Sequence, residues 1–256
     1  MLKIRIIPTL LFKDVGLVKG VAFDSWRRVG SAMQAVKVYN LRAVDELVFL
    51  DISATRDGRP PDFAAIDELA DECFMPMTVG GGVRNFADAR RLVKVGADKI
   101  ALNTALIESP DLVREIAESY GTQFVVASID VKQHADGRYE VYTRSGTQPT
   151  GVDPVALAEQ VEKSGAGEIL LTSIDRDGTM QGYDIELNRR VSAAVNIPVI
   201  ASGGAGSYEH MAQVLRETSV TAVAAASIFH FTEQTPLEAK RYLQKQGFAV
   251  RKEAAG

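Results

Sequence analysis

Short apolar segments alternate with amphipathic segments along the whole chain. The apolar runs are rich in β-branched residues, and their nearly continuous hydrophobic positions are typical of parallel strands covered on the outside. Eight such strands are predicted, at Ile4–Leu11, Glu46–Ile52, Met75–Val79, Lys99–Asn103, Gln123–Ile129, Glu168–Ser173, Pro198–Ala201 and Thr221–Ala226. Helical periodicity predicts eight helices between and after them, at Ser31–Val44, Phe63–Glu72, Phe86–Val95, Asp111–Ser119, Pro154–Lys163, Ile185–Ala194, Tyr208–Arg216 and Pro236–Lys245.

The strict alternation of strands and helices predicts the fold class. Eight strands and eight helices fit an α/β fold, a single (β/α)8 TIM barrel over residues 1–256. A doubly wound open sheet is the alternative, but no Gly-x-Gly-x-x-Gly follows the first strand, and eight even units favour closure. Asn85 and Ser207 directly precede helices and are expected to cap them.

The chain also resembles itself at a period of about 120 residues. Three pairs of segments show this: Glu46–Leu50 with Glu168–Thr172, Arg56–Gly58 with Arg176–Gly178, and Val79–Gly82 with Ala201–Gly204. We expect two half-barrel repeats, at about 1–120 and 121–245, which form one barrel because a half-barrel alone would leave sheet edges exposed. A site in one half should therefore have a counterpart in the other.

Two connections between a strand and the next helix are long, residues 12–30 and 131–153. Long glycine-bearing loops on the catalytic side of a barrel are candidate lids, and ordinary surface loops are the alternative. The second connection contains Tyr139–Thr143 and a turn at Gly146, which predict a small hairpin.

Composition excludes several classes of function. The net charge of −4 argues against nucleic acid or anionic membranes as partners, so any phosphate binding has to be local. Cys73 is the only cysteine, and the sequence has neither a signal peptide nor an apolar run long enough to span a membrane. These features predict a cytoplasmic protein. The three histidines lack metal-ligand spacing, so no metal and no cofactor are expected.

Glycines and hydroxyl residues at strand ends predict two phosphate sites. Glycine pairs let backbone amides approach an anion, and they end the third and seventh predicted strands, each followed by the hydroxyl residue that ends the next strand. The expected phosphate contacts are Gly81, Gly82 and Thr104 in the first half, and Gly178, Gly203, Gly204, Ala226 and Ser227 in the second. Two sites across the mouth suggest a ligand with a phosphate at each end.

Three carboxylates are expected at the same end of the barrel, where they could act as general acids or bases. Asp130 closes an apolar strand, so it should be partly desolvated with a raised pKa, and it is the strongest catalytic candidate. Asp51 is expected either to contact the ligand or to support its loop, and Asp177 either faces the ligand or pairs with Arg176. Lys19, within the first long connection, either folds over a phosphate or stays solvated.

Charged residues mark the opposite end. Four of them start strands, Arg5, Glu46, Lys99 and Glu168. They are expected to form either a ring of mutual salt bridges across the bottom of the barrel or a set of exposed charges.

Together these residues resemble the HisF family, the cyclase subunits of imidazole glycerol phosphate synthase. The resemblance covers nearly the whole chain and rests on residues 5–8, 18–20, 45–52, 78–84, 96–99, 175–179 and 200–206. It implies a phosphorylated, bisphosphate-type ligand, catalytic roles for Asp130, Lys19, Asp51 and Asp177, and a HisH-like glutaminase docked on the bottom face. It further implies that Arg5, Glu46, Lys99 and Glu168 gate the entry of ammonia, and that Asp98 and Gln123 contact the glutaminase.

The sequence departs from this pattern at Leu11. The family's two catalytic aspartates fall at positions 11 and 130, and only Asp130 is kept. The segment Leu10–Asp14 instead resembles a WbuZ-type subgroup found with surface-polysaccharide genes, which implies a glutaminase and a separate sugar amidotransferase as partners. Loss of a general acid or base typically slows such chemistry at least 10²-fold. The sequence therefore favours an ammonia-receiving barrel for sugar amidation, and the alternatives are a working cyclase of histidine biosynthesis and a non-catalytic scaffold that activates a glutaminase.

Overall fold

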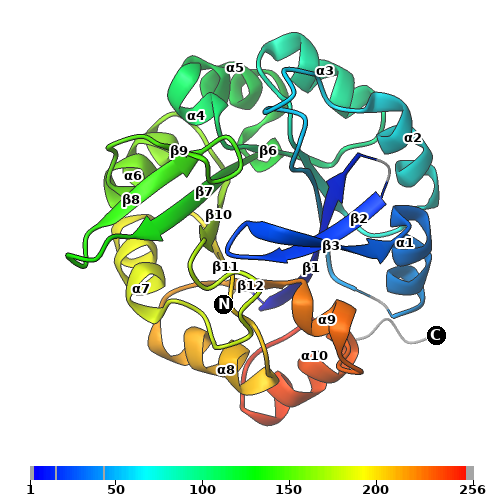
Figure 1. The fold of residues 1–256 in the computed structure, drawn as a ribbon, viewed down its shortest axis with the longest axis vertical. Helices are drawn as coiled ribbons and strands as arrows, with labels where there is room; N and C mark the ends of the chain where they lie inside the picture. Colours follow the sequence, from blue (N-terminus) through cyan, green and yellow to red (C-terminus); the bar gives the residue numbers. More distant parts are fainter. Residues whose placement is uncertain (1–2, 15, 43, 252–256) are drawn as a thin grey trace.

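Eight parallel strands close into a barrel in the computed structural model, which describes residues 3–14, 16–42 and 44–251 (Figure 1). The strands follow one another around the barrel in chain order and the last pairs with the first. They are β1 (Arg5–Lys13), β4 (Leu47–Asp51), β5 (Met77–Gly80), β6 (Lys99–Leu102), β7 (Val125–Gln133), β10 (Glu168–Ser173), β11 (Val199–Ser202) and β12 (Ala222–Ala225). The predicted (β/α)8 barrel is confirmed, and the open sheet is wrong.

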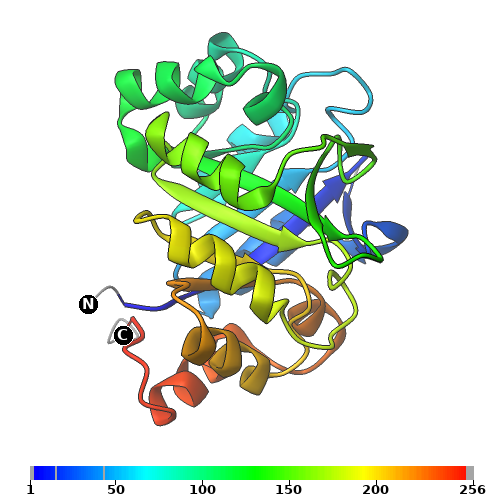
Figure 2. The same ribbon diagram turned by 90° about the vertical axis from the view of Figure 1, so that its left-hand side faces the viewer.

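Helices ring the outside of the barrel (Figures 1 and 2). Asn85 and Ser207 accept hydrogen bonds from the amides of Asp88 and His210, so both predicted N-caps are confirmed. The eight expected helices are α1 (Ala32–Leu41), α2 (Phe63–Glu72), α3 (Phe86–Lys94), α5 (Asp111–Tyr120), α6 (Pro154–Lys163), α7 (Ile185–Ala194), α8 (Tyr208–Glu217) and α10 (Pro236–Lys245). Two short helices, α4 (Ala105–Glu108) and α9 (Ser227–Phe231), follow β6 and β12, at corresponding places in the two halves.

The core has two layers. The larger lies between the strands and the helices, and the smaller fills the inside of the barrel. The inner layer consists of Ile7, Val48, Ala101, Val126, Leu170, Ile200, Ala222 and Ala224, with the partly buried Leu50 packed against it. Filling the barrel interior with side chains leaves the two ends of the barrel as the places for chemistry.

The first long connection forms two antiparallel strands, so the prediction of an ordinary surface loop is wrong there, and its role as a lid stays a prediction. β1 runs on to Lys13 and pairs antiparallel with β2 (Gly16–Val21), which pairs with β3 (Asp24–Gly30). β3 is mostly exposed and polar, so the hydrophobic pattern of a buried strand is missing there.

The second long connection holds the predicted hairpin. β7 pairs antiparallel with β8 (Tyr139–Thr143), and β8 pairs with β9 (Gln148–Pro149). The two antiparallel extensions therefore follow the first and fifth barrel strands, at corresponding places in the two repeats. Both lie at the end toward which the strands point (Figure 2). Among the described residues, no helix is long and apolar enough to cross a membrane.

Candidate functional site at the carboxyl ends of the strands

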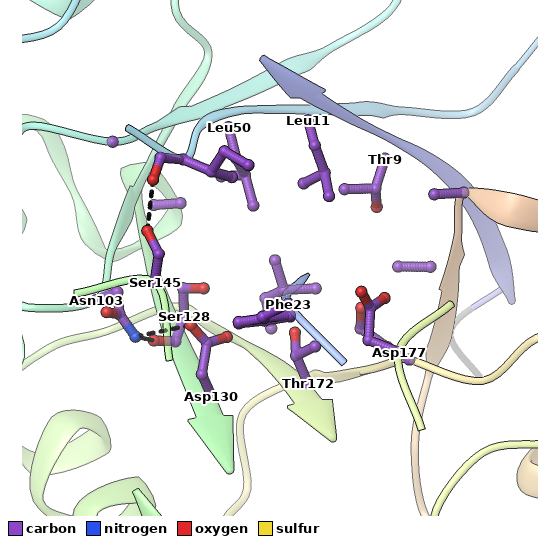
Figure 3. Close-up of a pocket in the computed structure, with 18 of the residues that line it drawn as sticks. Thr9, Leu11, Phe23, Leu50, Asn103, Ser128, Asp130, Ser145, Thr172 and Asp177 are labelled. Atoms are coloured by element: carbon purple, nitrogen blue, oxygen red, sulfur yellow. Dashed lines mark hydrogen bonds between the residues drawn. The ribbon is translucent and has the colours of Figure 1, made fainter. Parts of the chain in front are cut away.

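A hollow lies at the carboxyl ends of the barrel strands (Figure 3). The structure brings every predicted catalytic and phosphate-binding residue to its wall. The predicted catalytic residues there are Asp130, Lys19, Asp51 and Asp177, and the predicted phosphate contacts are Gly81, Gly82, Thr104, Gly178, Gly203, Gly204, Ala226 and Ser227. Phe23 and Trp26 reach the same hollow from the β2–β3 hairpin. The positions agree with the sequence analysis, while the roles of these residues stay predictions.

Asp130 lies near the carboxyl end of β7 and is buried. Burial, followed by the charge of Asp177, raises the pKa of Asp130 to about 8, against the lowering effect of a hydrogen bond with Thr172. The side-chain amide of Asn103 donates to Asp130 Oδ2 at 3.3 Å and to the carbonyl of Ser128 at 3.0 Å. The raised pKa agrees with the expectation from the sequence, and a carboxyl with this pKa is mainly protonated near neutral pH and suited to donate a proton.

Leu11 lies across the hollow from Asp130 (Figure 3). Its backbone is in register with Leu50 on β4 and with Val18 on β2. Asp130 has the same surroundings in the other half, in register with Thr172 on β10 and with Tyr142 on β8. The two residues therefore occupy equivalent positions, and the wall on the side of Leu11 and Leu50 is apolar where the opposite wall is polar.

Lys19 and Asp177 form an ion pair inside the hollow. Lys19 Nζ lies 2.5 Å from Asp177 Oδ2, and Lys19 is only 2% exposed. The prediction of a solvated lysine is therefore wrong, and the carboxylate of Asp177 pairs with Lys19 instead of Arg176. The backbone joins the same two segments, because the amide of Ala22 donates to the carbonyl of Asp177 at 2.8 Å. The first hairpin is thus fixed to the loop after β10.

Asp51 supports its own loop. Its Oδ1 accepts hydrogen bonds from the amides of Ser53 and Ala54, both at 3.0 Å. The guanidinium of Arg59 binds both carboxylate oxygens, with Nη1 at 2.7 Å from Oδ2 and Nη2 at 3.1 Å from Oδ1. Of the two roles left open by the sequence, these contacts favour loop support, although Asp51 still lines the hollow.

The first cradle consists of Gly81, Gly82 and Thr104. The amide of Gly82 donates to the hydroxyl of Thr55 at 3.2 Å, and the hydroxyl of Thr104 accepts from the amide of Arg144 at 3.1 Å. A Cβ on Gly81, whose φ is +103°, would lie 2.1 Å from the carbonyl oxygen of Asp51, so packing of the chain on itself already requires glycine there.

The second cradle consists of Gly203, Gly204 and Ser227, with Gly178 and Ala226 beside it on the wall of the hollow. The Ser227 hydroxyl is buried and has no hydrogen-bond partner among the described residues. The hydroxyl of Thr9, which lines the same hollow, is likewise buried and without a partner in the described part of the chain. Such groups are rare in folded proteins, because a buried polar group without a hydrogen bond is destabilising.

The four charged residues at the strand starts form the expected ring. Glu46 and Glu168 alternate with Arg5 and Lys99: Lys99 Nζ lies 2.8 Å from Glu46 Oε1 and 2.9 Å from Glu168 Oε2, and Arg5 pairs with both glutamates. Burial alone would raise the pKa of Glu168, but hydrogen bonding and the charge of Arg5, followed by those of Lys99, hold it below its usual value. The salt-bridge alternative is therefore confirmed.

Asp98 and Gln123 are exposed residues on the same bottom side. Asp98 exchanges hydrogen bonds with Met77, accepting from its amide at 2.8 Å through Oδ2. Gln123 lies in a short 3-10 helix (Thr122–Phe124), outside the strand predicted for it, and lines a shallow hollow together with the four residues of the ring. Nothing in the described residues groups three or more His, Cys, Asp or Glu side chains as a metal site would.

Sequence reasoning missed Asn103, Phe23 and Trp26 as parts of the site. Asn103 directly precedes Thr104 at the end of a predicted strand, and that placement was the available signal. Phe23 and Trp26 carried no signal, because the hairpin that brings them to the hollow was read as a loop.

A sequence model of the family described as "Histidine biosynthesis protein" matches residues 5–235. The chain belongs to this family. The match runs from the first residue of β1 to the residue before α10, so it includes all eight barrel strands and the whole hollow. Members of this family are enzymes of histidine biosynthesis, isomerases and cyclases, so the chain is a member of an enzyme family.

Proposed function

We propose that this barrel is the ammonia-receiving subunit of a two-part glutamine amidotransferase, with a phosphorylated ligand at its mouth and a role in sugar amidation in place of histidine synthesis. The observation that carries the proposal is Leu11, an apolar side chain in the position equivalent to Asp130. A cyclase that used opposed carboxylates would lack one of them here, because leucine transfers no proton. The resemblance to WbuZ-type chains supports the choice of a sugar as the acceptor.

The ring at the bottom supports the ammonia route. Two cations and two carboxylates neutralise one another at the end of the barrel opposite the hollow. Because its charges cancel, the ring has no net charge that would retain ammonium or an anion. Above the ring, the interior of the barrel contains small side chains such as Ala101, Ala222 and Ala224. Passage of a molecule the size of ammonia requires a rearrangement of these ion pairs, which a docked partner could drive.

The proposed glutaminase partner is tested with the glutaminase whose gene lies nearest to the gene of this chain. Mixed with the barrel, the glutaminase is expected to form a complex in gel filtration and to hydrolyse glutamine faster than it does alone. Asp98→Lys is expected to weaken the complex at least tenfold, while Glu115→Lys, an equal charge reversal on the exposed face of α5, is expected to leave it unchanged. Equal binding by both variants, or no complex with the unaltered chain, would contradict the proposed docking face.

A working cyclase is the second candidate, and the Lys19–Asp177 pair favours it. This pair places a second carboxylate, with a lysine beside it, on the wall of the hollow that also holds Asp130. Asp51 is held by its own loop and Arg59, and Asp14, the carboxylate nearest to Leu11 in the sequence, lies in the β1–β2 turn away from that wall. A cyclase predicts that the chain complements a histidine auxotroph that lacks this activity. Failure to complement by well-expressed protein would eliminate this candidate. A pure scaffold would instead bind no ligand at the mouth.

A further inference from the structure

The two cradles differ in what their polar groups already bind. In the first cradle the Gly82 amide donates to Thr55, and the Thr104 hydroxyl accepts from the Arg144 amide while it donates to Asn103 Oδ1 at 3.4 Å. In the second cradle the Ser227 hydroxyl has no partner among the described residues, so its proton is free to be donated. Equivalent positions in the two repeats therefore differ in their capacity to bind an anion.

A turn of the chain itself covers the first cradle. This turn, Arg144–Gly146 after β8, is held by the Arg144 amide on Thr104 and by the Ser145 hydroxyl, which donates to the carbonyl of Ile52 at 2.6 Å (Figure 3). Arg144 and Ser145 have φ of +52° and +57°, a left-handed conformation that is strained for residues other than glycine. The turn keeps this conformation because its contacts with the first half outweigh the strain.

The cations near the two cradles differ in the same sense. Arg144, the cation next to the first cradle, directs its guanidinium at Glu108, with Nη2 at 2.6 Å from Oε1. Lys19 lines the hollow. Its positive charge is also close enough to His230 on α9 to help lower the pKa of that imidazole, after the larger effect of burial. α9 begins at Ser227. The backbone next to Lys19 packs on Gly178 beside the second cradle, because a Cβ on Gly178 would lie 2.1 Å from the carbonyl oxygen of Gly20, so the Lys19 charge lies on that side. An anion there would share Lys19 with Asp177 and find two hydroxyls without partners, those of Ser227 and Thr9.

From these contacts we infer that the mouth binds one anionic group, a phosphate in the second cradle, and that the opposite end of the ligand is uncharged. The inference rests on the proposed phosphorylated ligand and narrows its class from a bisphosphate to a monophosphate. Leu11 and Leu50 form the apolar wall of the hollow, while Asp130, largely protonated near neutral pH, and Thr172 form its polar wall. A phosphate monoester with a neutral body that has apolar and hydroxyl-bearing faces fits this arrangement.

Inorganic phosphate tests the inference on the unaltered chain. Equilibrium titration followed by phosphorus NMR is expected to count one phosphate ion per chain. Fructose 6-phosphate and fructose 1,6-bisphosphate are expected to compete for that site with affinities within about threefold of each other. Two ions per chain, or a bisphosphate that binds at least tenfold more tightly than the monophosphate, would overturn the inference and leave the proposed function standing. No bound phosphate would overturn both the inference and the proposed phosphorylated ligand.

Two serine variants locate the bound ion. Ser227→Ala is expected to weaken phosphate binding tenfold or more, the effect of losing one hydrogen bond to a charged group. Ser145→Ala, the matched change in the turn over the first cradle, is expected to weaken it less than twofold. An equal loss in both variants, or a larger loss with Ser145→Ala, would contradict binding in the second cradle. If either variant folds poorly, the number of phosphate ions bound by the unaltered chain still decides between one site and two.

Discussion

Leu11 lies opposite Asp130 across the mouth of the barrel (Figure 3). It occupies, in the first half of the barrel, the position that Asp130 occupies in the second half. Each residue sits where a barrel strand, paired with its parallel neighbour, also begins to pair with an antiparallel hairpin. The strand pairing around the two positions is thus the same, while the chemistry of their side chains differs. The charge of Asp177, which is paired with Lys19, still acts on Asp130.

The raised pKa of Asp130 predicts a pH-dependent stability. The pKa of about 8 in the folded chain exceeds the value of about 3.9 for an unfolded aspartate, so the folded state holds a proton that the unfolded state has released. Stability from this group is complete below pH 4 and falls as the pH rises toward 8, by up to about 1.4 kcal/mol per pH unit. Asp130→Asn removes this dependence. Urea unfolding at pH 5 and pH 8 is expected to show that the variant gains stability relative to the unaltered chain at pH 8, and parallel pH profiles would contradict it.

The Lys19–Asp177 pair predicts a coupling in unfolding free energy. Lys19→Met leaves a buried carboxylate without its cation and is expected to cost about 3 kcal/mol or more. Asp177→Asn leaves the ammonium unpaired and is expected to have a similar cost. The double variant should cost clearly less than the sum of the two, and additive costs in a double-mutant cycle would show that the pair contributes nothing.

Asp177 also predicts a change at Asp130. Its negative charge is one of the causes that raise the pKa of Asp130, second to burial. Asp177→Asn is therefore expected to lower the pKa of Asp130, as followed by carboxyl carbon NMR during a pH titration. The matched change Asp175→Asn, in the same loop but bonded to the amide of Gln133, should leave that pKa within a few tenths of a unit. Equal shifts of the Asp130 pKa in both variants would show that the charge of Asp177 is not what raises it.

The ring at the bottom predicts a loss of stability that depends on acid. Glu168→Gln leaves Arg5 and Lys99 one carboxylate short and is expected to cost about 3 kcal/mol at pH 7. The pKa of Glu168 is lowered in the folded chain, so its contribution is present above the unfolded pKa of about 4.3 and lost as the pH falls through the folded value. The cost should therefore shrink toward pH 3 in thermal unfolding. Glu186→Gln, in an exposed pair with Arg190, is the control and should change little.

The repeating pattern of strands predicted the barrel and its mouth because buried parallel strands have a strong hydrophobic signal. The carboxyl ends of parallel strands lie at the same end of a barrel, so each correctly predicted strand end placed its polar residues there. For this reason Asp130, Gly203 and Ser227 all line the hollow. The four charged residues at the strand starts were placed at the other end for the same reason, while the choice between a salt-bridge ring and exposed charges stayed open. Asp51 and Lys19 each had two open interpretations, since the partners that decide between them, Arg59 and Asp177, are fixed by loop geometry.

The first hairpin could not be predicted from its sequence pattern. Only one face of β3 packs against the protein, and its residues Asp24, Arg27 and Arg28 are exposed, so the segment carries the composition of a loop. The turn over the first cradle was missed for a related reason. Arg144 and Ser145 adopt a left-handed conformation that neither residue favours, and only their contacts with Thr104 and Ile52 hold it.

Cyclase turnover with ammonium in place of glutamine tests the central claim most directly. The purified chain is assayed with the ribulosyl-aminoimidazole carboxamide phosphate substrate of the cyclase, beside a Leu11→Asp variant whose folding is verified by its unfolding curve. The account predicts turnover at least 10²-fold below ordinary enzyme rates for the unaltered chain, because the position opposite Asp130 carries no proton donor or acceptor. Turnover of the unaltered chain at ordinary enzyme rates, about 1 per second or faster, would contradict it.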